Sequence, residues 1–357
     1  MSVLQRVADA LSVSVAELRG DDEEPESDER PEAFETIRLA LTGHPAIGTV
    51  LGTVQPGAAG HLATYRRQHA GIWDLVHASR YTDLTPVLAV LIPGLEAVAR
   101  SAGTDDTRIE ARELLADTYQ AAAAMLAKIG EMDAAWIAAD RAGFCAETAG
   151  SPLGLAASMF RMAHVFLALG RTDQAQHVAA TMAAALEPRL TPQAEPAVLS
   201  LYGGAHLILA VAAARDNQRR QAHDHLDTAR RAASQLGQDR DDHGTEFGPA
   251  NVALHAVSIA VELGDAGEAI ELAQNLDTSG LSPERQARNY RDLAQAYAMR
   301  RQIGEALSAL AQTEHIAPEE TRAHYVSHAV ARDLIQPSGL RARPELRELA
   351  ERLGVLP

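Results

Sequence analysis

One short pattern occurs five times between residues 130 and 310: a turn residue, an alanine five positions later, and a small or apolar residue four positions after that. The copies are Gly130/Ala135/Ala139, Gly170/Ala175/Ala179, Asn217/Ala222/Leu226, Gly264/Ala269/Ala273 and Arg301/Ala306/Leu310. Gly and Asn often end helices in the left-handed conformation, and small residues let two helices approach closely. Each copy therefore predicts the joint of an antiparallel helix pair, and the series predicts an α-solenoid.

The composition favours the same fold class. Hydrophobic residues make up 46% of the chain but aromatic residues only 4%, so burial depends on Ala, Leu and Val, which suit closely packed helices. Successive joint alanines lie further apart than the ~34 residues of a tetratricopeptide unit. The extra length falls in residues 187–197 and 237–250. We predict an all-α, right-handed superhelical solenoid of helix pairs.

We expect three segments along the chain. Residues 1–20 contain two short helical patterns, residues 21–60 form an acidic and then glycine-rich linker with a short helix, and residues 61–357 form the array with its C-terminal capping helices. The acidic run carries like charges and prolines, which favour a solvated linker.

Both ends of the array are expected to be irregular. In residues 61–100 we expect an atypical first pair, in which Pro86 replaces the joint alanine and Pro93 bends the second helix. Residues 318–335 predict one further helix. Residues 344–354 predict a terminal helix that Pro344 begins and Gly354 ends.

Several observations bear on location and charge. Cys145 is a single cysteine and the N-terminus has no export signal, so we expect a cytoplasmic protein. The uncharged run 42–65 is broken by prolines and glycines, and the run 197–214 falls where the repeat requires a buried helix, so we expect no membrane span. The net charge of −16 argues against binding nucleic acid by electrostatics.

The repeat units resemble degenerate tetratricopeptide units. The unit around Gly170 places Met159, Met162, Ala163 and Phe166 at the family's Trp, Leu, Gly and Tyr positions, and the last unit places Tyr290, Leu293, Ala294 and Tyr297 there. At the N-terminus, LQRVADALSVSVAELRG resembles the last two helices of the lambda-repressor-like helix-turn-helix domain of the XRE family. Almost the whole chain therefore resembles an XRE-family transcriptional regulator of the actinobacterial type, with a C-terminal tetratricopeptide domain.

This resemblance implies a regulator in which the array binds a signal peptide, a small molecule or a partner segment and controls a DNA-binding head. It also implies a homodimer, because such heads bind two-fold operators. The helix that enters the major groove precedes the fragment present here, so we expect DNA binding only if the missing N-terminal head is restored. The alternative is a headless interaction scaffold without DNA binding.

In a tetratricopeptide array, the groove is lined by the first helix of each pair. Its second, fifth, ninth and twelfth positions predict the ligand-groove residues Asp117, Gln120, Phe160, His164, Asn251, Leu254, Ser258, Arg288, Arg291 and Gln295. The Asn251 amide can pair with a peptide backbone, and Arg288 and Arg291 suit a carboxylate.

No pattern predicts catalysis or a cofactor. His324 and His328 are spaced for one helix face with Glu320 a turn earlier, but the motif lacks the glutamate of zinc proteases, so we expect surface histidines and no metal. Cys145 is expected to be a buried structural thiol. The sequence has no nucleophile elbow and no phosphate loop, and we expect a protein that is not an enzyme.

Overall fold

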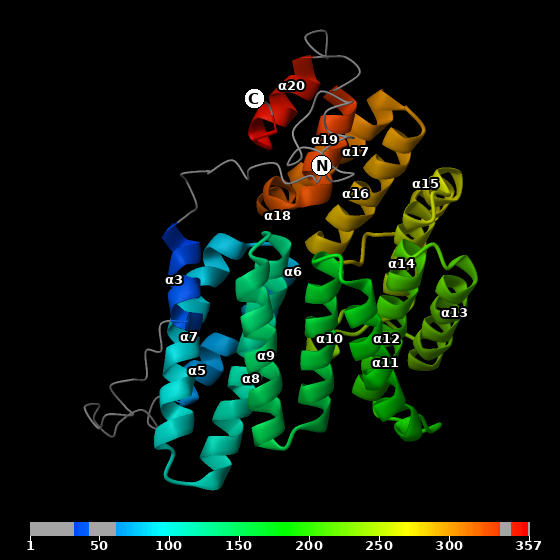
Figure 1. The fold of residues 1–357 in the computed structure, drawn as a ribbon. Helices are drawn as coiled ribbons and strands as arrows, with labels where there is room; N and C mark the ends of the chain where they lie inside the picture. Colours follow the sequence, from blue (N-terminus) through cyan, green and yellow to red (C-terminus); the bar gives the residue numbers. More distant parts are fainter. Residues whose placement is uncertain (1–31, 43–61, 336–343, 356–357) are drawn as a thin grey trace, which may run out of the picture.

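The computed structural model describes residues 32–42, 62–335 and 344–355. Within these ranges every regular element is a helix, and strand-like pairing is limited to an isolated bridge between Arg240 and Phe247. The helices stack in consecutive pairs along a curved path (Figure 1). The all-α solenoid predicted from the repeated joints is therefore confirmed.

Five regular helix pairs form the middle of the array. They are α8 Asp105–Lys128 with α9 Met132–Ala149, α10 Pro152–Ala168 with α11 Thr172–Leu186, α12 Pro196–Arg215 with α13 Arg219–Leu236, α14 Pro249–Glu262 with α15 Ala266–Asn275, and α16 Pro283–Met299 with α17 Ile303–Ile316. The first helix of each pair contacts the first helix of the next. The helices α8, α10, α12, α14 and α16 therefore form one continuous inner layer.

The five joints share one backbone geometry. Their turn residues all have positive φ: Gly130 86°, Gly170 68°, Asn217 56°, Gly264 82° and Arg301 58°. After each, the next N–H donates to the carbonyl five residues earlier, at 2.7 to 2.9 Å, which closes the helix end with a Schellman hydrogen bond. The five joint alanines are each 0% exposed. The joint prediction is confirmed at every copy.

The first pair contains a sixth joint that the sequence reading placed wrongly. Its first helix is split into α5 Leu62–His69 and α6 Ile72–His77, and its second helix is α7 Tyr81–Ser101. Ser79 has φ 52°, and Leu84, five residues later, is fully buried. Leu84 therefore takes the alanine position that was assigned to Pro86. Both prolines lie within α7, which remains one helix.

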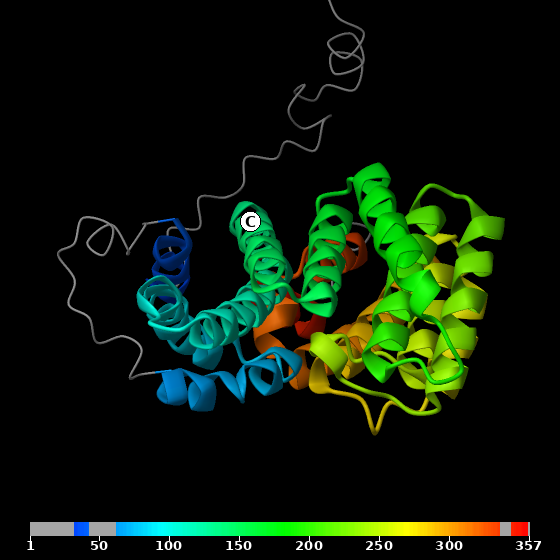
Figure 2. The same cartoon turned by 90° about the horizontal axis from the view of Figure 1, so that it is seen from below.

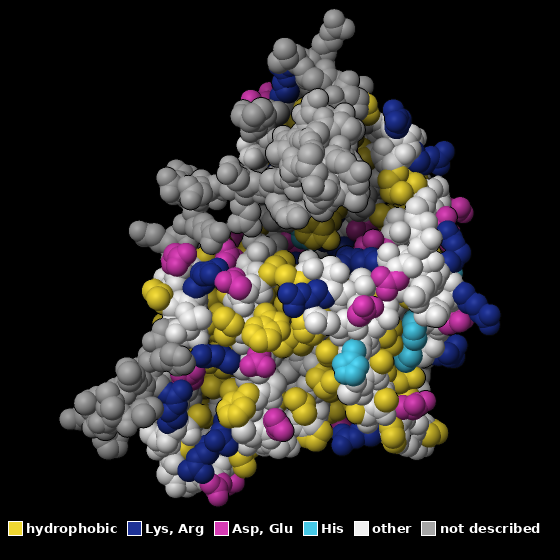
Figure 3. All heavy atoms as spheres, viewed as in Figure 1, with side chains coloured by type: hydrophobic (Ala, Val, Ile, Leu, Met, Phe, Trp, Pro, Cys, Tyr) yellow, Lys and Arg dark blue, Asp and Glu magenta, His cyan; other side chains and the backbone are white. Residues whose placement is uncertain are grey.

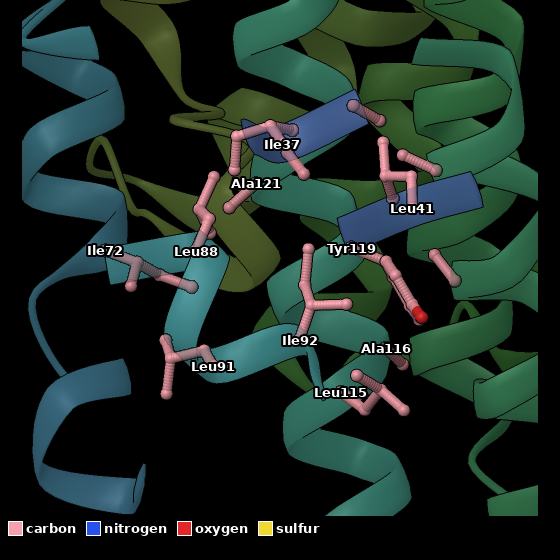
Figure 4. Close-up of a cluster of buried hydrophobic side chains, with 14 of the residues drawn as sticks. Ile37, Leu41, Ile72, Leu88, Leu91, Ile92, Leu115, Ala116, Tyr119 and Ala121 are labelled. Carbon is pink, nitrogen blue, oxygen red and sulfur yellow. The ribbon is translucent and has the colours of Figure 1, made fainter. Parts of the chain in front are cut away.

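The short helix expected in the linker belongs to the folded core. It is α3 Glu32–Thr42, and it packs against α7 and α9. Its Ile37 and Leu41 are fully buried in a cluster with Leu88, Ile92 and side chains of α8 (Figure 4). The expected helical patterns in residues 1–20, the acidic run and the glycine-rich stretch lie outside the described residues, apart from this helix.

The C-terminal part differs from the prediction in one respect. The single helix expected over residues 318–335 is two helices, α18 Pro318–Ala323 and α19 Tyr325–Ile335, because the backbone at His324 is extended. The terminal helix α20 Pro344–Arg352 begins and ends as predicted, with Gly354 at φ 67°.

The curved array brings its two ends together. In Figure 2 the blue helix α6 lies beside the yellow and orange C-terminal helices, and it contacts α16. Glu320 of α18 accepts a hydrogen bond from Ser79 Oγ at 2.9 Å, and Glu319 accepts one from the Thr82 N–H at 2.8 Å. The stack is therefore closed by contacts between residues more than 230 positions apart.

Among the described helices, two, α7 and α12, are long and apolar enough to cross a membrane by length and composition. In α12 the apolar stretch is 83% buried inside the protein, and in α7 it is 44% buried. The prediction that residues 197–214 form a buried helix of the array is confirmed.

Candidate binding cavity

The long connection between α13 and α14 folds into the inside of the array. This inner loop, residues 237–248, contains the short 3₁₀ turn η3 Asp242–Gly244. The Arg161 guanidinium of α10 donates to the carbonyls of His243 and Gly244, and Arg285 of α16 donates to the Thr245 carbonyl at 3.2 Å. The inner loop thus joins two inner helices across the concave side.

The first helix pair holds the inner loop from the other side. The indole ring of Trp73 on α6 lies so close to Gly244 that an added Cβ there would come within 2.5 Å of it. The two ring nitrogens of His77 contact Asp241 at 3.0 Å and Glu246 at 3.1 Å. Burial opposes protonation of His77, but the two carboxylates outweigh it and raise its pKa to about 9. His77 is therefore a cation at neutral pH.

A cavity of about 220 Å³ lies at the centre, where α6, α8, α10, α12, α14, α16 and α19 meet. This volume is more than ten times the ~10–15 Å³ that one water needs. Its lining combines apolar side chains such as Val165, Ile208 and Val211 with six Lys or Arg side chains and only three Asp or Glu side chains. The cavity is therefore basic in a chain of net charge −16.

Most of these cations have carboxylate partners. Glu320, which is fully buried, contacts Arg291 at 2.9 Å and Lys128 at 3.3 Å, and it also accepts from Ser79 and Tyr81. Burial opposes ionisation of Glu320, but Lys128 and Arg291 outweigh it and hold its pKa below its usual range. This ion cluster forms one wall of the cavity and closes the array.

Arg161 is the exception among the cavity cations. It is 8% exposed, and it pairs with no carboxylate in the part of the chain that the structure describes. Its Nε is buried and has no hydrogen-bond acceptor among those residues. The guanidinium lies over the Trp73 ring at 4.6 Å from its centre. Burial and the nearby Arg285 lower the pKa of Arg161 to about 10, so it remains charged at neutral pH.

Arg288 is only partly neutralised. Its closest carboxylate, Asp292, lies 4.0 Å away, and the guanidinium contacts Ser258 Oγ at 3.1 Å and His255 Nε2 at 3.2 Å. Burial and neighbouring arginines lower the pKa of His255 and His164 well below the usual histidine value. Both histidines are therefore neutral, and the positive charge of the cavity comes from its arginines and Lys128.

The predicted groove residues divide into three groups. Five line the central cavity: His164, Ser258, Arg288, Arg291 and Gln295. Two line a separate groove of about 490 Å³ beside α5 and α6: Asp117 and Gln120. Three line neither, because they are packed into the protein: Phe160, Asn251 and Leu254.

The sequence reading assumed an open groove, but several of its positions are covered by other parts of the chain. Asp117 accepts a hydrogen bond from Trp73 Nε1 at 2.9 Å. The Asn251 amide, expected to clamp a peptide backbone, donates to the Glu246 carbonyl of the inner loop. Arg291 already pairs with Glu320. The first pair, the inner loop and α18 therefore occupy much of the expected groove.

The sequence reading also missed cavity residues, notably Arg161, Arg285 and Lys128. A usable signal exists for Arg285, because it precedes Arg288 by three residues on the same helix, as Arg288 precedes Arg291. Arg161 likewise precedes His164 by three. Lys128 and His77 carry no such signal, because their position depends on the closure of the array.

The residues considered as metal ligands or as a reactive thiol have structural roles. Glu320 is held in the ion cluster, the His328 ring contacts the Arg322 carbonyl at 2.6 Å, and the described residues contain no group of three or more potential metal ligands. Cys145 is 7% exposed, and burial together with the charge of Glu96 raises its pKa to about 12. It is a buried thiol, as predicted.

The sequence matches no protein-family model, and no curated protein matches it significantly.

Proposed function

We propose that this chain is the sensor and dimerisation part of a transcription regulator, and that a signal ligand binds in the central cavity. The observation that carries the proposal is the position of the cavity, which lies where the first pair, the inner layer and the C-terminal helices meet. A ligand that prefers one packing of these elements shifts the balance between closed and open forms of the array.

A mechanical connection from the cavity to the N-terminal segment supports the proposal. Tyr81 at the start of α7 lines the cavity and contacts Glu320. The helix α7 also packs against α3. Arg38 of α3 pairs in addition with Asp133 of α9 at 2.7 Å. A shift of α7 would therefore move α3, which residues 21–31 join to the segment that resembles the DNA-binding head.

The expected pairing with a second copy has a candidate surface on α9. Its Trp136 and Phe144 are 45% and 66% exposed, and hydrophobic side chains gather over this side of the molecule in Figure 3. Burying large apolar side chains is a main source of affinity in protein interfaces. Light scattering should give a dimer mass for the wild type and a monomer mass for Phe144→Glu. A monomeric wild type would contradict this part of the proposal.

The ligand proposal is tested with fractionated cell extract. Small-molecule and peptide fractions are added to the wild type and to Val211→Trp, which fills the cavity with a larger apolar side chain, and thermal unfolding is recorded. We expect at least one fraction to raise the melting temperature of the wild type only. If no fraction does so, or if both proteins respond equally, the cavity does not bind a signal.

A further inference from the structure

Arg161 is a buried guanidinium that forms no ion pair with a carboxylate of the described residues, and Asp241, Asp117 and Glu284 act on it only from beyond ion-pair distance. Burying an ionised group is costly unless it is paired and hydrogen-bonded, so buried arginines normally meet carboxylates. Arg161 instead meets two backbone carbonyls and the faces of Trp73 and Phe160, and its Nε has no acceptor among the described residues. These contacts stabilise a cation only in part. An anion at this place would complete its coordination.

Other groups around the cavity strengthen the attraction for an anion. Arg288 lines the same cavity with its nearest carboxylate at 4.0 Å, and Arg285 is close enough to lower the pKa of Arg161. His164 and His255 are neutral, so the attraction for an anion comes from the arginines and Lys128 alone. The lining has six basic and three acidic side chains, and Glu320 and Glu246 behind it neutralise part of the difference, so a bound monoanion reduces the remaining positive charge.

The rest of the lining sets the shape of the ligand. The lining also includes the aliphatic side chains Leu207, Ile208 and Val211 of α12. A volume of about 220 Å³ excludes an extended peptide lying inside the cavity. Small-molecule sites combine such apolar walls with a few fixed polar groups.

We infer that the signal ligand is a small organic acid, with a carboxylate or phosphate held by Arg161 and Arg288 and an apolar part against α12. This inference rests on the proposed function and names the chemical class of its ligand. A guanidinium can hold either kind of anion by two parallel N–H donors.

Isothermal titration with hexanoate, hexanamide and inorganic phosphate tests the inference. Hexanoate and hexanamide have nearly the same shape but differ in charge. We expect hexanoate to bind with a Kd in about the millimolar range, phosphate to compete with it, and hexanamide to bind at least tenfold more weakly. If hexanamide binds as well as hexanoate, or if neither anion binds at tens of millimolar, the inference is wrong.

Variants locate the site. Arg161→Gln should weaken hexanoate binding at least tenfold, whereas Arg220→Gln, which removes the same charge from a side chain 94% exposed on α13, should leave it unchanged. Because Arg161 also holds the inner loop, Arg288→Gln serves as a second variant and should weaken binding as well. Circular dichroism checks that each variant is folded. Equal affinity in Arg288→Gln and the wild type would overturn the assignment of the site.

The two proposals fail separately. If a neutral or peptide fraction of cell extract stabilises the wild type but not Val211→Trp, while no anion binds, the sensor function stands and the organic-acid inference falls. If anions bind through Arg161 but no extract fraction acts, the site is real and its role as a sensor is contradicted.

Discussion

Substituting Glu320 with glutamine should destabilise the protein far more than its position on a six-residue helix would suggest. Glutamine keeps the volume of the side chain but removes its charge, so Arg291, whose side chain is 5% exposed, loses its ion-pair partner among the described residues. Lys128 retains Glu284. Breaking a buried pair from one side typically costs about 3–5 kcal/mol. We expect a loss of this size.

Urea unfolding followed by circular dichroism measures this loss. With an m-value of about 3 kcal/mol/M, the midpoint should fall by about 1 to 1.7 M. Glu271→Gln on α15 is the control, because Glu271 is exposed. The double variant Glu320→Gln with Arg291→Gln should lose less free energy of unfolding than the two single variants lose in sum, by about 1–3 kcal/mol. A loss below 1 kcal/mol, or strict additivity, would refute the role given to the ion cluster.

The same pair predicts a pH dependence. The pKa of Glu320 is lower in the folded protein than its ordinary value of 4.5, so its contribution to stability is complete above that value and is lost as the pH falls through the folded pKa. The stability difference between wild type and Glu320→Gln should therefore shrink in acid. A difference that stays constant down to the acid transition would contradict the assignment.

Three further predictions concern the inner loop, the joints and the thiol. The pKa of His77 is raised from 6.5 to about 9. The wild type should therefore be more stable than His77→Gln below pH 6.5, and this difference should be lost as the pH rises through about 9. A difference in stability that does not depend on pH would contradict the pairing of His77 with Asp241. Gly264→Ala should cost about 1 kcal/mol because alanine disfavours positive φ, whereas Arg301→Gly should stabilise by up to about 1 kcal/mol in urea unfolding. If Gly264→Ala stabilised the protein and Arg301→Gly destabilised it, backbone conformation would not control the stability of the joints. Cys145 should react with a thiol reagent only after unfolding, and rapid labelling of the folded protein at neutral pH would contradict its burial.

The local features of the fold could be predicted from the sequence because they depend on neighbouring residues. At all five joints a turn residue of positive φ is followed five positions later by a buried alanine. Arg301 has this conformation although it is neither Gly nor Asn. The same rule would have placed the sixth joint at Ser79 if leucine had been admitted at the alanine position. The sequence prediction placed the joint at Pro86 instead, but Pro86 lies in the second turn of α7, two residues after Leu84.

The candidate site could be predicted only in part because it depends on contacts between distant segments. Helix positions identified Arg288 and His164 correctly as inward-facing, since both belong to the inner layer. The same reasoning predicted that Asn251 and Asp117 face a ligand. In the structure the inner loop covers Asn251 and α6 covers Asp117. The path of a loop of about a dozen residues and the closure of the array are not encoded in helical periodicity.

Closure of the array also determines when the binding cavity can exist. During synthesis the N-terminal pairs leave the ribosome first and can stack on their neighbours as they emerge, because each pair contacts mainly the next. Glu320, which pairs with the cavity-lining Lys128 and Arg291, is made late, and it contacts Ser79 and Tyr81, which were made some 240 residues earlier. A nascent or C-terminally shortened chain would thus have stacked pairs but no complete cavity. Competence to bind a ligand therefore reports that the chain has been made and folded at least as far as α19.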